Sequence, residues 1–231
     1  MKITKIGGTS GYQVHLQLAL NDAVSAYEEA HDAVSRHPPL TEQNATPQLT
    51  LLHYSLERRR ITALVLAACC VEALANLYLA QKTTSEQFAV LERAAFLDKW
   101  VVLPSLFLPG YSLPKDQELY QDLKRLNVRR NALVHLKEEV TRGDWVVHPP
   151  FHPEVASDEH VFVGRCRSLP ERLLTHLAAF DKTDAIAQVS GVLAVTATMR
   201  EMSRLTRGCT RRPPDRERRP RVNRSRYAGP E

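Results

Sequence analysis

Apolar residues recur with helical spacing along most of this 231-residue chain. Residues 12–36 keep a rough 3.6-residue period with charged positions on the opposite side, which predicts a first helix. The proline-containing segment 37–47 breaks that pattern and predicts a loop. A second and longest helix is expected over 49–82, and its part from 61 to 80 carries one charged residue in twenty.

That apolar part is long enough to cross a bilayer. Glu72 and Asn76 lie near its middle, however, where hydrocarbon disfavours both side chains, and the segment is rich in alanine. We therefore expect the central helix of a soluble bundle and no membrane partner. The N-terminal residues lack the apolar core of a signal peptide, which favours a cytoplasmic location.

Two sequences with capping-box spacing predict further helix starts. Thr84-Ser-Glu-Gln87 predicts a helix that runs to about residue 100, and Ser168-Leu-Pro-Glu171 predicts another helix after it. Additional helices are expected from about 116 to 139 and from 181 to about 204. Proline-rich connectors separate these segments.

The stretch 144–165 has a different character. Residues 145–147 and 160–163 are short β-prone runs on either side of a loop rich in proline and histidine, which predicts a small two-stranded appendage. The expected fold is therefore all-α. It is an up-and-down helical bundle of about five or six helices in a single domain over residues 1–206, with a β-hairpin appendage.

The formal net charge of +5 hides an uneven distribution. Residues 204–231 contain ten arginines and three acidic residues, a balance of +7, so residues 1–203 carry about −2. The folded body is thus not a basic nucleic-acid platform. From 207 to 231 arginine and proline dominate, and we expect a disordered tail. Two interpretations stay open for this tail: nonspecific binding to RNA or an acidic partner, or a solvated extension.

Cofactor and metal chemistry find little support in the sequence. The four cysteines form no C-x-x-C pair, so neither a disulfide framework nor a zinc knuckle is indicated. Prolines separate His148 from His152, and with His160 they are expected to be surface histidines rather than metal ligands. Adjacent Cys69 and Cys70 are expected in the core. No glycine-rich phosphate loop occurs, so no cofactor is expected.

The most unusual stretch is Asn127-Val-Arg-Arg-Asn-Ala-Leu-Val-His135. Asn127, Asn131 and His135 follow one another at four-residue intervals and share one helix face, while leucines lie on the other side. Arg130 precedes His135 by five positions, about 140° around an ideal helix. The two meet only if the arginine stem curls, if the helix starts irregularly, or if the histidine comes from a second copy of the chain.

These residue types suit metal-free RNA cleavage. That reaction needs a base, a cation for the charge that grows on the phosphate, and an acid for the leaving oxygen. Histidine titrates near neutral pH, and the planar guanidinium of arginine pairs with phosphate. A purely structural role would produce the same sequence pattern. In that alternative Glu72 and Arg130 form a buried ion pair, and Asn76 and His135 form hydrogen bonds with each other.

The pattern Arg130-Asn131-x-x-x-His135 resembles the signature of the HEPN superfamily. The segment Ala67–Tyr78, which contains Glu72 and Asn76, and the sequence Leu97-Asp-Lys-Trp100 extend the resemblance over about 55–140. The resemblance implies a small helical bundle, often dimeric, and in many members a metal-independent ribonuclease of prokaryotic toxin–antitoxin or other defence systems.

The resemblance also implies roles for individual residues. His135 would be the general base or acid, Arg130 the phosphate clamp and Asn131 the group that positions the substrate or the histidine. Glu72 and Asn76 would hold that pair from the central helix. RNA, a second copy of the chain and an antitoxin are the implied partners. The alternative is a catalytically inactive HEPN-like module that binds a nucleotidyltransferase-type or other protein, or a nucleotide.

Overall fold

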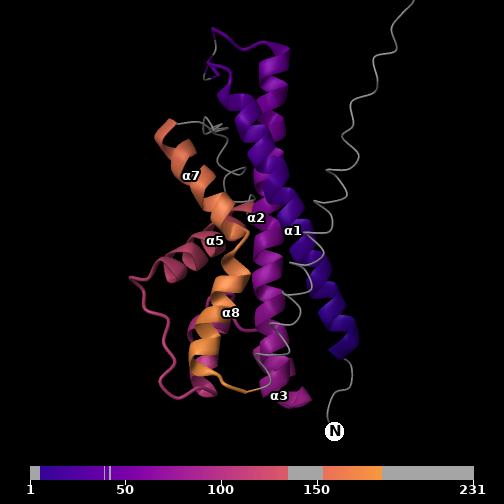
Figure 1. The fold of residues 1–231 in the computed structure, drawn as a ribbon, viewed down its shortest axis with the longest axis vertical. Helices are drawn as coiled ribbons and strands as arrows, with labels where there is room; N and C mark the ends of the chain where they lie inside the picture. The colour runs from indigo at the N-terminus through magenta and orange to yellow at the C-terminus, as the bar shows by residue number, and fades with distance from the viewer. Residues whose placement is uncertain (1–5, 39, 42, 135–152, 184–231) are drawn as a thin grey trace, which may run out of the picture.

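The computed structural model describes residues 6–38, 40–41, 43–134 and 153–183 (Figure 1). These residues are mostly helical and include no strand, so the all-α prediction is confirmed for the described part of the chain. The elements are α1 (Ile6–Ser35), α2 (Pro47–Lys82), α3 (Ser85–Leu91), α4 (Asp98–Val101), the 3-10 helix η1 (Leu103–Leu106), α5 (Glu118–Val134), α7 (Pro153–Cys166) and α8 (Leu169–Phe180).

Helix α2 is the central element, as predicted. It begins where the Thr46 hydroxyl accepts a hydrogen bond from the Leu49 amide, with Pro47 in the first turn, and both features favour a helix start. It contacts α1, α3, α4, α5, α7 and α8. Such a helix is covered on several sides, which explains why its second half is apolar around most of its circumference.

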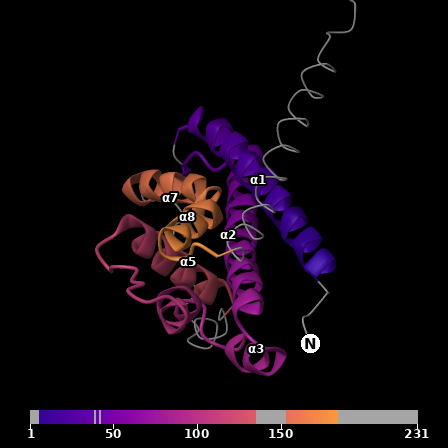
Figure 2. The ribbon, with the colours of Figure 1, turned by 60° about the horizontal axis from the view of Figure 1, so that its bottom comes forward.

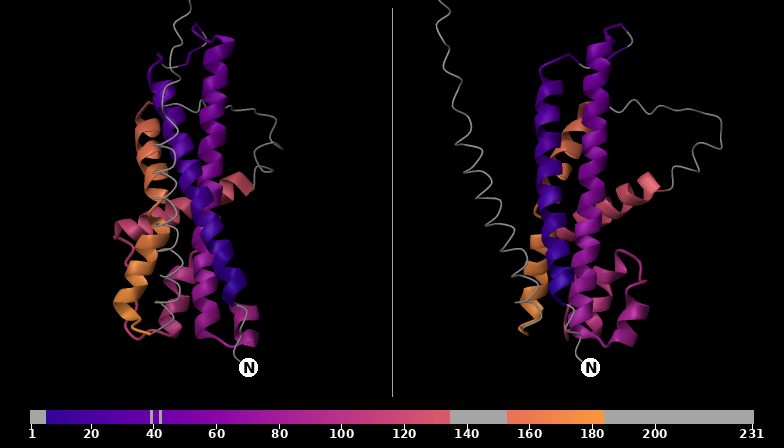
Figure 3. Two further views of the ribbon diagram at one scale, coloured as in Figure 1. Left: turned by 45° about the vertical axis from the view of Figure 1, so that its right-hand side comes forward. Right: turned by 90° about the vertical axis from the view of Figure 1, so that its right-hand side faces the viewer.

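The other helices surround α2 unequally. Helix α1 runs beside α2 for much of its length, whereas α5 crosses α2 steeply (Figure 3). Helices α7 and α8 follow one another along α2 (Figure 1), and α5 and α8 lie together on one side of it (Figure 2). Their shared core includes Leu74 of α2, Leu123 and Leu126 of α5, and Leu173 and Leu177 of α8, all buried.

By length and composition alone, α2 is the one helix among the described residues that could cross a membrane. A single helix of this kind is weak evidence for a membrane span. In its most apolar 18-residue window, 61% of the residues are buried inside the protein. That burial is the pattern of a helix packed in a protein core.

The prediction of a β appendage is wrong for its second strand. Residues 160–163 lie within helix α7, where Phe162 and Val163 are buried in the core. The β-branched and aromatic residues favour a strand only weakly, and packing of one helix face against α1 and α2 overrides that preference. His160 is not a loop residue either, because its ring stacks on His31 of α1 with centroids 3.7 Å apart. The first predicted strand, 145–147, lies outside the described residues.

The helix predicted from residue 84 to about 100 is only partly right. The capping box forms, since Thr84 and Gln87 exchange side-chain-to-backbone hydrogen bonds, but α3 ends at Leu91. A turn then precedes α4 and brings Phe96 and Trp100 into the core. Helix α3 itself buries no residue. A straight continuation of α3 would therefore bury less apolar surface than the turn does.

The second capping box does not form. Helix α8 begins after Ser168 as predicted, but the Ser168 hydroxyl makes no cap bond and donates to the Arg165 carbonyl instead. The motif helix begins at Glu118, close to its predicted start. The predicted continuation to 139, the helix over 181–204 beyond residue 183, and the tail 207–231 lie outside the described residues.

Candidate functional site

Helix α5 carries the arginine of the motif and is anchored by one apolar side. Leu123 and Leu126 are fully buried, as predicted, and Leu133 packs partly buried against the same core. Asn131 is exposed on the other side. Arg130 follows Leu126 by four and Leu123 by seven positions, so it lies on the same side of α5 as these leucines, near the end of the helix. Its side chain is nevertheless 37% exposed. His135 lies outside the described residues.

The central helix meets the motif arginine through Glu72. Arg130 Nη2 donates to Glu72 Oε2 over 3.3 Å, which confirms the predicted contact between the two helices. The Glu72 side chain is 30% exposed. The pair is therefore not the buried ion pair that the structural alternative requires, because solvent reaches both charged groups.

A third charged residue, which the sequence did not reveal, joins this pair. Lys99 of α4 places Nζ 2.9 Å from Glu72 Oε1, and its side chain is only 2% exposed. Glu72 thus bridges two cations with its two oxygens. The Phe96 ring, from the turn before α4, lies 5.7 Å from Arg130 Cζ in a cation–π arrangement. Lys99, Glu72, Arg130 and Phe96 form what we call the Arg130 cluster.

The two asparagines of the predicted site lie in different surroundings. Asn76 follows Glu72 by one turn and is half-buried, and its Oδ1 has no hydrogen-bond partner among the described residues. Asn131 is exposed and, within the same described residues, makes no hydrogen bond to the Arg130 cluster. The structure therefore brings together Glu72 and Arg130 from the predicted set and leaves Asn131 at the surface.

One signal in the sequence could have identified Lys99. Apart from the adjacent Asp98, it is the one charged residue from Phe96 to Phe107, and a charged group in such apolar surroundings needs a counter-charge. The nearest unassigned carboxylate in an apolar helix was Glu72. That reasoning pairs the two residues, although it cannot show that Glu72 also reaches Arg130.

A second charged cluster holds the other flank of α5. Glu159 of α7 is buried and accepts from Arg60 Nη1 at 2.7 Å, Arg125 Nη2 at 2.8 Å and Arg129 Nη2 at 2.9 Å. Burial would raise the pKa of Glu159, but the hydrogen bond from Arg125 and the charges of Arg129 and Arg60 outweigh it and lower the pKa. Arg125 also covers the Phe162 ring at 4.5 Å. This Glu159 cluster joins α2, α5 and α7.

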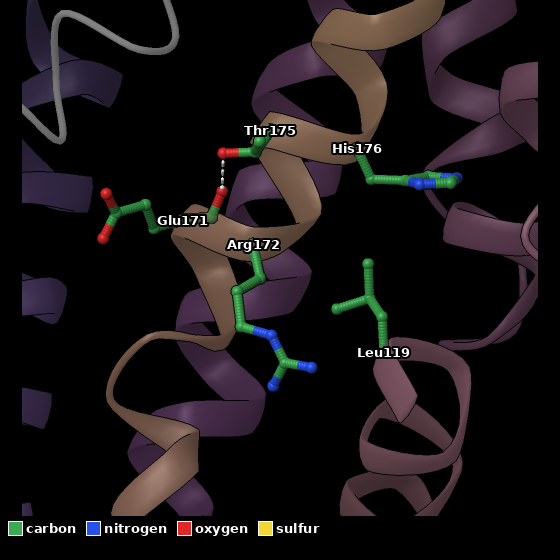
Figure 4. Close-up of a pocket in the computed structure, with 5 residues that line it drawn as sticks. All are labelled: Leu119, Glu171, Arg172, Thr175 and His176. Atoms are coloured by element: carbon green, nitrogen blue, oxygen red, sulfur yellow. Dashed lines mark hydrogen bonds between the residues drawn. The ribbon is translucent and has the colours of Figure 1, made fainter. Parts of the chain in front are cut away.

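A shallow pocket of about 400 Å³ lies elsewhere, between the start of α5 and α8 (Figure 4). Its lining residues are Leu119, Glu171, Arg172, Thr175 and His176. The arginine is already paired, since Arg172 contacts Asp122 at 2.7 Å and Glu118 at 2.9 Å. His176 Nε2 lies 2.8 Å from the Ser112 carbonyl oxygen. The pocket's one arginine is therefore already paired with two carboxylates, and Glu171 adds a negative charge, so the lining disfavours an anionic substrate.

Neither metal ligands nor an activated thiol emerge from the described residues. Within them, no group of three or more histidine, cysteine, aspartate or glutamate side chains could hold a metal ion. Cys69 is exposed, so the expectation that it lies in the core is wrong, while Cys70 is buried as expected and Cys166 is buried too. Burial raises the pKa of Cys70 to about 12, so this thiol stays protonated and unreactive at neutral pH. The Arg130 cluster is therefore the candidate site.

Comparison with known proteins adds no relative. No protein-family model, no curated protein and no solved structure matches this chain.

Proposed function

We propose that this protein is a HEPN-like, metal-independent endoribonuclease with Arg130 as its phosphate-binding cation. The observation that carries the proposal is the partly exposed contact between Arg130 and Glu72. The motif arginine is held from the central helix, yet its side chain stays 37% exposed. The proposed fold is the up-and-down helical bundle of that superfamily, and the proposed setting is a cytoplasmic toxin–antitoxin or defence system.

The contact leaves Arg130 with binding capacity. A guanidinium has five N–H donors, and among the described residues only Nη2 bonds to a carboxylate. The remaining donors can form paired, charge-assisted hydrogen bonds with a phosphate. Glu72 limits the rotation of the arginine without enclosing it. Such a preorganised cation stabilises the charge that develops on the phosphorus-bound oxygens in the transition state.

The remaining roles follow the sequence motif. His135 is proposed as the general base or acid, because imidazole titrates near neutral pH. Asn131, exposed beside Arg130, is proposed to position the substrate or the histidine. Asn76, with its unpartnered Oδ1 one turn from Glu72, is proposed to hold the histidine. A homodimer would place two such motif faces around one RNA strand.

Charge favours a second candidate function. Residues 1–203 carry a formal net charge of about −2, whereas RNA binding draws on neutralisation of many phosphates. A catalytically inactive module would need no such neutralisation. In that role the same surface would bind a protein partner, such as an antitoxin or a nucleotidyltransferase, or a nucleotide.

Conservative substitutions test the catalytic proposal. Arg130→Lys keeps the charge but loses the planar fork, and His135→Gln keeps polarity but cannot transfer a proton. Each variant should stay folded and cleave a fluorescent single-stranded RNA at least about 100-fold more slowly. Wild-type cleavage should persist in excess EDTA and leave a 2′,3′-cyclic phosphate.

The neighbouring residue provides a matched control. Arg129 is exposed to the same extent as Arg130, 38% against 37%, but pairs with Glu159 in place of Glu72. Arg129→Lys should therefore retain wild-type cleavage. A folded His135→Gln protein that cleaves RNA at the wild-type rate would rule out the catalytic assignment. Absence of cleavage by the wild type, combined with capture of a partner protein, would favour the inactive module.

A further inference from the structure

Lys99 is the only buried lysine or arginine among the described residues. Its side chain is 2% exposed, and Glu72 is its one ion-pair partner in that part of the chain. Moving an ammonium group from water into a protein interior costs several kcal/mol unless a counter-charge and hydrogen bonds offset the loss. A surface lysine could balance the charge of the partly exposed Glu72 at a much smaller desolvation cost.

The segment that carries Lys99 is rigidly held. Trp100, its neighbour in α4, is buried, and the Tyr111 hydroxyl donates to the Trp100 carbonyl over 2.6 Å. The Val102 amide closes the helical turn by donating to the Asp98 carbonyl over 3.0 Å. The backbone that carries Lys99 is therefore held in place, and the burial of its side chain keeps the ammonium beside Glu72.

The two oxygens of Glu72 are divided between the cations. Lys99 takes Oε1 at 2.9 Å, and Arg130 reaches only Oε2, at the longer distance of 3.3 Å. A carboxylate and a guanidinium that meet without a competitor tend to form two parallel hydrogen bonds. Lys99 occupies the oxygen that the second bond would need. The trio of two cations and one carboxylate keeps a single positive charge.

We propose that Lys99 is a positioning residue for Arg130 that acts through Glu72. By holding Oε1 it prevents Glu72 from closing a two-bond pair with Arg130, and it leaves the guanidinium available to a phosphate group. Its importance for RNA rests on the function proposed above. The positioning itself is a property of the Arg130 cluster and can be measured without any cleavage.

The test begins with Lys99→Met, which keeps an unbranched buried side chain and removes the charge. The Nε–H signal of Arg130 in a ¹H–¹⁵N spectrum, assigned by its loss in Arg130→Lys, reports the state of the guanidinium. In folded Lys99→Met this signal should move, and its response to inorganic phosphate should weaken about tenfold. In the cleavage assay KM for the single-stranded RNA should rise by a similar factor, and kcat should fall as well because Arg130 also stabilises the transition state.

A double variant separates positioning from stability. In Lys99→Met/Glu72→Gln the neutral amide can no longer pair with Arg130 as an ion, so phosphate affinity and KM should return to near wild-type values. This variant also replaces a buried charge pair by neutral groups, so it serves when Lys99→Met alone does not fold. If the double variant keeps the weakened phosphate binding, the positioning role is wrong.

A second lysine gives the matched control. Lys82, at the end of α2, pairs with buried Asp181 at 2.7 Å and does not contact the Arg130 cluster. Lys82→Met should lower stability but leave the Arg130 signal, its phosphate response and KM unchanged. An Arg130 signal that is identical in wild type and folded Lys99→Met would overturn the inference.

The same experiments also distinguish failure of the ribonuclease proposal from failure of the positioning role. A wild type that cleaves no RNA, together with an Arg130 signal and phosphate response that change as expected in folded Lys99→Met, would refute the ribonuclease and uphold the positioning role. A wild type that cleaves RNA, with a folded Lys99→Met variant of unchanged KM and Arg130 signal, would refute the positioning role alone.

Discussion

At the scale of single residues, buried charge in this protein is stabilised by partners from distant parts of the chain. Asp181 shows the effect most clearly. It is buried, and its carboxylate accepts from Lys82 Nζ at 2.7 Å, the Tyr78 hydroxyl at 2.9 Å and the Thr183 amide at 3.0 Å. Burial alone would raise the pKa of Asp181, but these hydrogen bonds outweigh it and lower the pKa to about 2.

This shift predicts an acid-sensitive contribution to stability. Because the folded pKa lies below the unfolded value of about 3.9, the contribution is present above about pH 4 and is lost as the pH falls towards 2. It amounts to up to about 2 kcal/mol. Urea unfolding of wild type and Asp181→Asn at several pH values should show the variant less stable at pH 6. The difference should shrink below pH 4.

A constant difference between the two proteins from pH 6 to pH 2 would contradict this account. It would mean that Asp181 acts through its shape and hydrogen bonds rather than through its charge.

At the scale of elements, α5 is held by charged clusters on both flanks. Glu159 joins it to α2 and α7, and Glu72 joins it to α2 and α4. The apolar side of α5 fixes its depth in the core, while these charges oppose its rotation about its own axis. The orientation of Arg130 therefore depends on more than the burial of Leu123 and Leu126.

Two adjacent acidic residues of α7 allow a controlled test of the Glu159 cluster. Glu159→Gln leaves three arginines without their shared, buried carboxylate and should destabilise the fold by about 2–4 kcal/mol. Asp158 contacts the same Arg125, but its side chain is 70% exposed, so Asp158→Asn should cost less than about 1 kcal/mol. Thermal or urea unfolding measures both. Equal costs would show that burial does not decide the strength of this cluster.

At the scale of the whole molecule, charge is divided between the body and the C-terminal segment. Residues 1–203 carry about −2 and residues 204–231 about +7. Any long-range attraction to RNA therefore comes from the arginine-rich end, whereas Arg130 can contribute only at the site of contact.

Removal of residues 208–231 tests this division. The segment contains eight arginines and few apolar residues, so its loss should change Tm by less than about 2 °C. The binding of single-stranded RNA should also depend less on salt. The magnitude of the slope of log binding constant against log salt concentration should decrease by about 2–4, since each phosphate contact contributes about 0.7. A large drop in Tm would show instead that this segment packs on the body.

The sequence alone determined that α2 is the central helix and where α3 and α8 begin. The Thr84–Gln87 capping box and the apolar period of α5 are local signals, because a helix start or an amphipathic face involves residues a few positions apart. The pairing of Glu72 with Arg130 was also predictable. A carboxylate within a long apolar helix needs a cation, and the motif supplied one.

Only the tertiary structure decided the rest. Residues 160–163 prefer a strand locally, but burial of Phe162 and Val163 between helices makes them helical. Lys99 meets Glu72 across 27 positions, and Glu159 meets Arg60 across 99. Which charged residues pair depends on where the helices cross and how far the side chains reach. Neither can be read from the hydrophobic periodicity of a single segment. Periodicity tells which side of a helix is buried, while the crossing geometry of α2, α4, α5 and α7 determines which charges meet there.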